Sequence, residues 1–196
     1  MPRSTASLRV ITDPRPPPAI PSPVLGMLIF VITEAMLFAG LISAFLIVKA
    51  TSAGAWPPPG QPRLPVEETA INTAALLASG VMLWRARRVF ATSHTDALRP
   101  LAIAIGLGAF FVLFQGYEWA MMLGQGLTFT SSNHGSFFYL IVGTHALHAV
   151  AALVYLAVVW WGLVHGSNVR YRFAGAQVFW YFVVGMWPVI YLKVYL

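Results

Sequence analysis

The sequence has 196 residues, of which 58% are hydrophobic and 9% are charged. A soluble domain carries roughly 25% charged residues because its surface must be hydrated, so most of this chain's surface is expected to face something other than water. The net charge of +6 does not indicate nucleic-acid binding, because the twelve Lys and Arg residues lie between apolar runs. The absence of cysteine excludes disulfides, thiolate-held iron–sulfur clusters and two-cysteine copper sites.

Residues 1–24 are predicted to form a basic, Pro-rich tail in an extended conformation. The tail has no short apolar core followed by a small-residue cleavage site, so we predict no secretory signal. Residues 25–196 are predicted to form one all-α transmembrane domain, because five apolar segments are each close to the ~20 residues that cross a bilayer as a helix. These segments are residues 25–48, 66–84, 98–122, 136–163 and 176–196.

The basic residues predict the orientation of this five-helix bundle. With the N-terminus inside, nine Lys and Arg residues lie on the inner side and three lie outside, namely Lys49, Arg63 and Lys193. Because inner loops of membrane proteins are enriched in Lys and Arg, we predict an inside N-terminus and an outside C-terminus. Segment 66–84 has the weakest apolar character of the five, since Glu67, Glu68 and Asn72 lie near its start.

Three ionisable side chains are expected at similar depth near the middle of the membrane. Glu34 lies nine residues into the first predicted helix, and His145 lies nine residues into the fourth, with His148 one turn further inward. A buried carboxylate costs roughly 2.5–3.5 kcal/mol on insertion scales, so a partner is expected. We therefore predict that His145 and His148 contact Glu34, which is either paired or protonated and hydrogen-bonded. The alternative is that each finds a separate backbone or water partner.

The other polar residues of the helices are interpreted as structural. Glu118 lies near the outer end of the third helix between Tyr117 and Trp119, a pattern typical of an interfacial anchor. Asn72 is expected to make an interhelical hydrogen bond, and Thr144 is assigned a structural polar role. Ligand types alone leave open a metal site of two His and Glu34, but we predict no metal, cofactor or catalytic residue in this chain.

Six blocks of this sequence resemble, in order, those of the haem–copper oxidase subunit III family of cytochrome c and quinol oxidases. Residues 30–38 resemble the segment that bears the family's carbodiimide-reactive glutamate, and residues 114–118 resemble its Gln-x-x-Glu turn. The other blocks are residues 56–60, 72–81, 135–148 and 180–187.

Two departures from the family pattern are visible. The last helix has Tyr181 and Val184 where the family usually has His and Asp, so polar contacts of those two residues are expected to be missing. The five helices resemble the last five of a seven-helix form in which lipids occupy a V-shaped cleft. One wall of that cleft is absent here, so we expect it to be open to bulk lipid or filled by another subunit.

The resemblance implies a non-catalytic subunit that contacts the flank of oxidase subunit I, other oxidase subunits and phospholipid. Haem and copper are expected in subunit I. The implied roles are support of proton uptake and of oxygen access during aerobic respiration, and protection of subunit I against inactivation during turnover. The implied location is a bacterial inner membrane. The electron donor is left open.

Three alternatives remain. The chain could belong to a nitric oxide reductase or a divergent respiratory supercomplex. It could be a stand-alone transporter using Glu34 and the histidines as a proton relay, although it has no inverted repeat. It could also be an assembly factor that leaves the mature complex.

Overall fold

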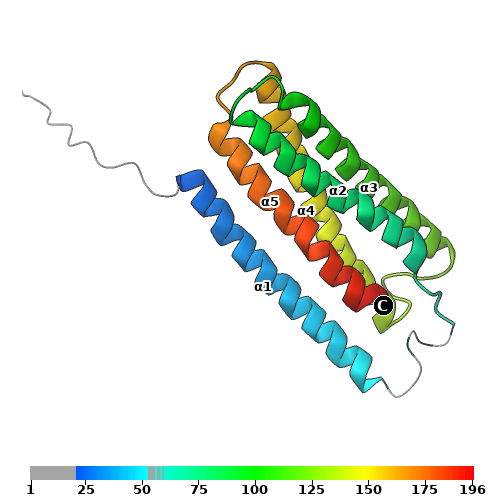
Figure 1. Cartoon of the computed structure of the whole chain (residues 1–196). Helices are drawn as coiled ribbons and strands as arrows, with labels where there is room; N and C mark the ends of the chain where they lie inside the picture. Colours follow the sequence, from blue (N-terminus) through cyan, green and yellow to red (C-terminus); the bar gives the residue numbers. More distant parts are fainter. Residues whose placement is uncertain (1–20, 53–55, 57, 59) are drawn as a thin grey trace, which may run out of the picture.

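The computed structural model describes residues 21–52, 56, 58 and 60–196, and every regular element in these ranges is helical. Five α-helices run in alternating directions and form one elongated bundle (Figure 1). This confirms the predicted all-α fold. The helices are α1 (Ser22–Thr51), α2 (Val66–Phe90), α3 (Leu98–Gly124), α4 (Asn133–Val164) and α5 (Arg170–Ile190), followed by a π-helical turn, η1 (Tyr191–Tyr195). The predicted tail, residues 1–24, lies largely outside the described residues.

Four of the helices are long and apolar enough to cross a membrane: α1, α3, α4 and the continuous stretch Arg170–Tyr195. The fifth helix, α2, is more polar, because it carries Glu67 and Glu68 in its first turn and Arg87 and Arg88 in its last. Its middle also contains Asn72 and other polar residues that are buried within the bundle. The charged ends and the buried polar side chains of α2 both lower its hydropathy, and the buried ones bind neighbouring helices.

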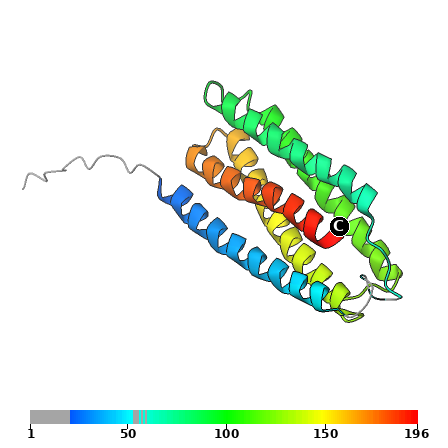
Figure 2. The same cartoon turned by 60° about the horizontal axis from the view of Figure 1, so that its bottom comes forward.

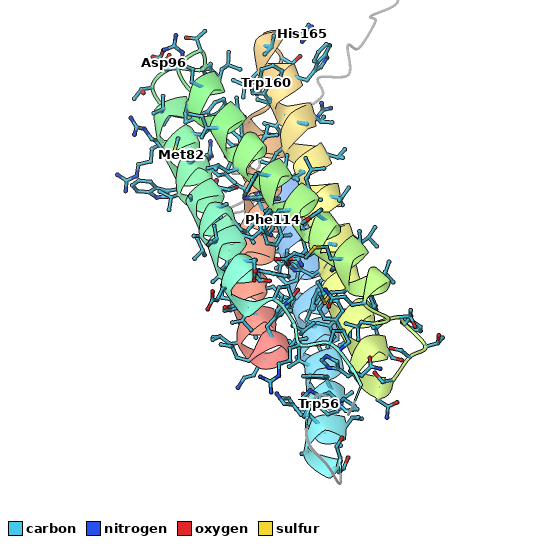
Figure 3. All side chains as sticks on the ribbon, turned by 90° about the vertical axis from the view of Figure 1, so that its right-hand side faces the viewer. Trp56, Met82, Asp96, Phe114, Trp160 and His165 are labelled. Carbon is cyan, nitrogen blue, oxygen red and sulfur yellow. The ribbon has the colours of Figure 1, made fainter. Side chains whose placement is uncertain are left out.

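The helices are not equally integrated into the bundle. Helices α2 and α3 pack closely along their length, α4 packs against both α3 and α5, and α1 lies along the outside against α5 (Figures 1 and 2). The buried residues of α1 are Phe38, Ile42 and Phe45, so most of this helix faces outward. Trp56 lies at one end of the bundle, and Asp96 and His165 lie at the other (Figure 3).

The observed helices are longer than predicted at several ends: α1 extends three residues further at each end, and α2 ends at Phe90, six residues late. Helix α4 begins at Asn133, three residues early, where the side chain of Ser132 accepts a hydrogen bond of 3.1 Å from the backbone N–H of Gly135. Helix α5 begins at Arg170, six residues early. Arg170 and Arg172, which lie between the predicted segments 136–163 and 176–196, occupy its first turn, because Arg is a good helix former whose charge stays exposed at a helix end. Pro188 lies inside α5, just before η1.

Two buried tryptophans of α5 fix its position against α2. The indole N–H of Trp180 donates to Ser79 Oγ at 2.9 Å, and the indole N–H of Trp187 donates to Thr73 Oγ1 at 2.8 Å. Gly108 of α3 leaves the space that Trp180 fills, since a Cβ atom there would lie 2.6 Å from two carbons of the indole ring. Close packing of this kind, with interhelical hydrogen bonds, stabilises helix bundles in lipid, where the hydrophobic effect does not distinguish a partner helix from lipid tails.

Candidate functional site

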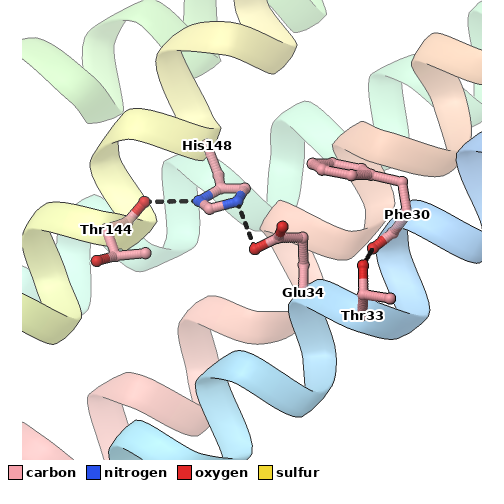
Figure 4. A network of polar contacts seen from close by, with 5 residues as sticks. All are labelled: Phe30, Thr33, Glu34, Thr144 and His148. Carbon is pink, nitrogen blue, oxygen red and sulfur yellow. Dashed lines mark hydrogen bonds and ion pairs between the residues drawn. The ribbon is translucent and has the colours of Figure 1, made fainter.

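Glu34 of α1 and His148 of α4 form a hydrogen-bonded pair between two helices. Glu34 Oε2 lies 2.9 Å from His148 Nε2 (Figure 4). The other ring nitrogen, Nδ1, lies 2.7 Å from the backbone carbonyl oxygen of Thr144, one turn earlier on α4. Glu34 lies twelve residues from Ser22, which corresponds to about 18 Å of helix. The pair therefore lies well inside the apolar length of α1.

The carbonyl of Thr144 determines how many protons this pair holds. A carbonyl oxygen can only accept, so Nδ1 of His148 must carry a proton and donate it. A neutral imidazole then has no proton on Nε2, and Glu34 must be the protonated donor. If His148 is instead doubly protonated, Glu34 is a carboxylate that accepts. In both states the pair has zero net charge and shares one proton between Oε2 and Nε2, which avoids an isolated charge in hydrocarbon.

Aromatic rings surround His148 and limit its contact with solvent. The ring centroids of Phe30, Phe38, Phe179 and Phe182 lie 5.6–6.3 Å from that of His148. The side chains of His148 and Glu34 are 10% and 18% exposed, respectively. Glu34 is thus the member of the pair that can be approached from the lipid side.

His145 does not join this pair, so the expectation that both histidines contact Glu34 is wrong for His145. Its side chain is 1% exposed, and neither ring nitrogen has a hydrogen-bond partner among the described residues. It instead packs against Trp187, Phe38 and Phe111, with centroid distances of 5.1, 6.1 and 6.3 Å. The ring of His145 therefore lies among side chains of α1, α3 and α5, but it makes no hydrogen bond to Glu34.

A second buried carboxyl group lies near the end of the bundle where α2 begins and α3 ends. Glu118 is 2% exposed, so its side chain is buried between helices and does not face outward as a surface anchor would. Its Oε2 accepts from Gln115 Nε2 at 2.7 Å, and its two oxygens lie 3.1 and 3.0 Å from Thr69 Oγ1. Gln115 Nε2 also donates to the hydroxyl of Tyr195 at 3.0 Å. The cluster joins α2, α3 and η1.

The hydrogen-bond geometry of this cluster favours a protonated Glu118. The hydroxyl of Thr69 has one proton, and its shortest contact, 2.6 Å, is to the carbonyl oxygen of Pro65. Because that carbonyl can only accept, Thr69 donates to Pro65, and its contact with Glu118 then requires a proton from the carboxyl group. The described residues form no ion pair with Glu118. A neutral acid satisfies every contact without leaving a charge in the bundle.

The remaining predicted polar residues have local roles. Asn72 donates from Nδ2 to the backbone carbonyl of Phe111 at 3.1 Å, which links α2 to α3. Thr144 contributes its backbone carbonyl to His148. At the two departures from the family pattern, Tyr181 accepts a hydrogen bond of 3.0 Å from Gln177 on the same helix, and Val184 packs against Gly80.

The described part of the chain contains no group of three His, Asp or Glu side chains that could hold a metal ion. Three residues of the Glu118 cluster were not predicted as partners of this carboxyl group. Gln115 was noted only as part of the Gln-x-x-Glu block, although it precedes Glu118 by three residues and so shares its helix face. Thr69 and Tyr195 gave no such signal, because they reach Glu118 from other elements.

Comparisons with known proteins identify the family to which this chain belongs. A family model described as cytochrome c oxidase subunit III matches residues 22–196. Cytochrome c oxidase subunit 3 of Lemur catta is 33% identical over 179 residues, covering 87% of this chain and 64% of that protein. Those of Pelea capreolus and Antilope cervicapra are each 32% identical, covering 87% of this chain and 67% of each relative. The chain thus spans about two thirds of the length of these relatives, and it belongs to the cytochrome c oxidase subunit III family.

Proposed function

We propose that this chain is a non-catalytic subunit III of a haem–copper terminal oxidase in aerobic respiratory electron transport. The observation that supports this proposal most strongly is the match of residues 22–196 to the family model. In this proposal the chain contacts subunit I, which holds the haems and copper, together with other oxidase subunits and membrane phospholipids. It stabilises subunit I and supports proton uptake and oxygen access.

The Glu34–His148 pair is the part of the chain best suited to a proton-linked role. It can pass one proton between Oε2 and Nε2 over a 2.9 Å hydrogen bond without changing its net charge. It lies at a depth where most neighbouring side chains are apolar, and the 18% exposure of Glu34 gives access from the side of α1. We assign Glu34 and His148 as the proton-linked residues, and we assign His145 only a packing role.

The membrane arrangement of the proposal follows from charge. The end of the bundle that carries Arg87, Arg88 and Arg170 faces the inside, and the end that carries Lys49 and Arg63 faces the outside. Helix α2 then crosses the membrane with the other four. A bacterial inner membrane is the location we propose.

Co-purification tests the proposal. The tagged full chain is extracted from its native membranes in a mild detergent, and the eluate is analysed by mass spectrometry and haem absorption spectra. The expected result is a complex that contains a haem-bearing, multi-histidine membrane subunit at a fixed ratio to this chain. Migration of the chain alone, without haem, would contradict the oxidase role and favour a stand-alone transporter.

The role of the pair is tested within the same complex. Glu34→Gln keeps the size of the side chain but removes the exchangeable acid proton. We expect this variant to assemble, yet to lose activity during sustained turnover faster than the wild type. Glu67→Gln, an exposed acid at the start of α2, is the matched control. Equal time courses for the two variants and the wild type would contradict the proton-linked role while leaving the subunit assignment intact.

A further inference from the structure

A polar pocket of about 290 Å³ lies at the end of the bundle where α1 joins α2. Its lining includes Lys49 at the end of α1, Trp56 and Arg63 from the connection, His134 in the first turn of α4, and Tyr195 of η1. The pocket is therefore built from segments that are distant in the sequence. It is separate from the Glu34–His148 pair, which lies in the interior of the helices.

The pocket concentrates positive charge. Of the three Lys and Arg residues near this end of the bundle, two line it, Lys49 and Arg63. Neither Lys49 nor Arg63 forms an ion pair with a described residue. Among the described residues, the one ion pair is that between His148 and Glu34. Leu196 also lines the pocket, and a carboxylate on this last residue of the sequence would offset one of the two cations. The lining still carries a net positive charge.

His134 is the second indication of a ligand. Its side chain is 3% exposed, yet neither ring nitrogen has a hydrogen-bond partner among the described residues. It is held edge-on against Trp56, with ring centroids 5.3 Å apart. A buried imidazole without a partner costs free energy, so a bound group that accepts its N–H proton would be favoured.

Hydrogen bonds join the chain segments next to the pocket. Ser131 Oγ lies 3.1 Å from Oε1 of Gln61, which brings the α3–α4 connection against the α1–α2 connection. The hydroxyl of Tyr191 donates to the backbone carbonyl of Val66 at 3.0 Å, which ties η1 to the start of α2. These contacts fix the connections beside the pocket, while Lys49 and Arg63, which are half-buried and exposed respectively, are free to turn toward a ligand.

We propose that this pocket binds a phosphate group, with the headgroup of an anionic phospholipid as its source. Lys and Arg are the usual partners of phosphate, and an imidazole N–H adds a third donor. The pocket lies at the end of the helices, at the level of lipid headgroups, and Leu64 and Val66 give it an apolar side that suits the glycerol and the first acyl carbons. The proposal rests on the placement of the chain in a membrane, and it does not depend on the oxidase role.

Native mass spectrometry tests this site on the full chain purified with its native partners. The complex is stripped of lipid, incubated with phosphatidylglycerol, and dissociated in the gas phase so that only lipid retained by this chain is counted. Lys49→Gln combined with Arg63→Gln is expected to weaken binding about a hundredfold, or about tenfold for each charge-assisted contact. Lys193→Gln is the matched control, because Lys193 is an exposed cation near the same end that does not line the pocket.

The second arm uses inorganic phosphate and phosphorus NMR. Competition by phosphate for the lipid, dependent on Lys49 and Arg63, would support the proposal. Broadening of the phosphate signal that depends on both cations, with no retained lipid, would support the phosphate site but overturn the headgroup as its source. Equal lipid retention by the double variant, Lys193→Gln and the wild type would overturn the proposal. Because both substituted side chains lie at the rim, the double variant is expected to fold, and co-purification checks this.

Discussion

The carboxyl group of Glu34 and the imidazole of His148 are joined over 2.9 Å, and this is the one hydrogen bond between α1 and the other helices in the described part of the chain. Helix α1 otherwise contacts the bundle through apolar packing, mainly against α5. The pair therefore has two physical consequences. It fixes α1 in register against α4, and it places one transferable proton in an apolar layer.

Replacing each histidine separately should distinguish the paired imidazole from the unpaired one. His148→Leu removes the partner of Glu34, so the free energy of unfolding should fall by about 1 kcal/mol, the usual size of an interhelical hydrogen bond in a membrane protein. His145→Leu removes a ring whose nitrogens have no partners among the described residues, so it should cost less. Thermal unfolding in detergent measures both. A larger loss for His145→Leu would contradict the assignment of the pair.

Counting residues along apolar runs predicted part of this arrangement. Depth follows from a rise of 1.5 Å per residue, so Glu34 and His148 could be placed at similar heights. Counting residues does not give the rotation of each helix about its axis, which decides the neighbours that a side chain faces. His145 and Glu118 lie at predictable depths, but the direction in which each faces depends on how α4 and α3 pack. Packing also explains why Glu118 is buried against Thr69 and Gln115 although its sequence neighbours Tyr117 and Trp119 suggest an interface.

The five helices were more predictable than the contacts between them, because each consists of a long apolar run. The early start of α5 was missed because Arg170 and Arg172 suggest a loop when charge alone is considered. The aromatic and small residues that determine helix packing, such as Trp180 and Gly108, have no periodic signal of their own. Their pairing becomes visible only when α3 and α5 are placed side by side.

Gly108 should be far less tolerant of substitution than Gly106 on the same helix. A Cβ atom at position 108 would lie 2.6 Å from two carbons of Trp180, whereas one at position 106 would have no neighbour within 4 Å. Gly108→Ala should therefore lower the free energy of unfolding by about 1–3 kcal/mol, as overpacking does in cores. Gly106→Ala should be neutral or slightly stabilising. The two are compared by thermal unfolding, and equal stability would show that α3 and α5 are not packed as described.

Two substitutions at Glu118 should have different effects if the carboxyl group is protonated. Glu118→Gln can donate from its amide to Thr69 and accept from Gln115, as a neutral acid does, so stability and assembly should change little. Glu118→Leu leaves the amide of Gln115 without this acceptor and should cost about 1–3 kcal/mol. The yield of assembled complex and its thermal stability measure the difference. Equal loss in both variants would indicate that a charged carboxylate is needed at this position.

The orientation can be tested cleanly because the chain contains no cysteine. Ser131→Cys, in the exposed α3–α4 connection, should react with a membrane-impermeant thiol reagent added from outside. Thr92→Cys, in the exposed α2–α3 connection, should react only after the membrane is permeabilised. The opposite pattern would reverse the orientation inferred from the Lys and Arg residues.

Mapping the reaction of a hydrophobic carbodiimide by mass spectrometry tests the central claim most directly, since this reagent enters from lipid and modifies protonated carboxyl groups. Glu34 is 18% exposed and shares a proton with His148, so it should be the main labelled residue. Glu118 is only 2% exposed and should be protected. Glu34→Gln should abolish the main product. Labelling confined to Glu67 and Glu68, with Glu34 unmodified, would contradict the claim that Glu34 is a proton-bearing carboxyl group within the membrane.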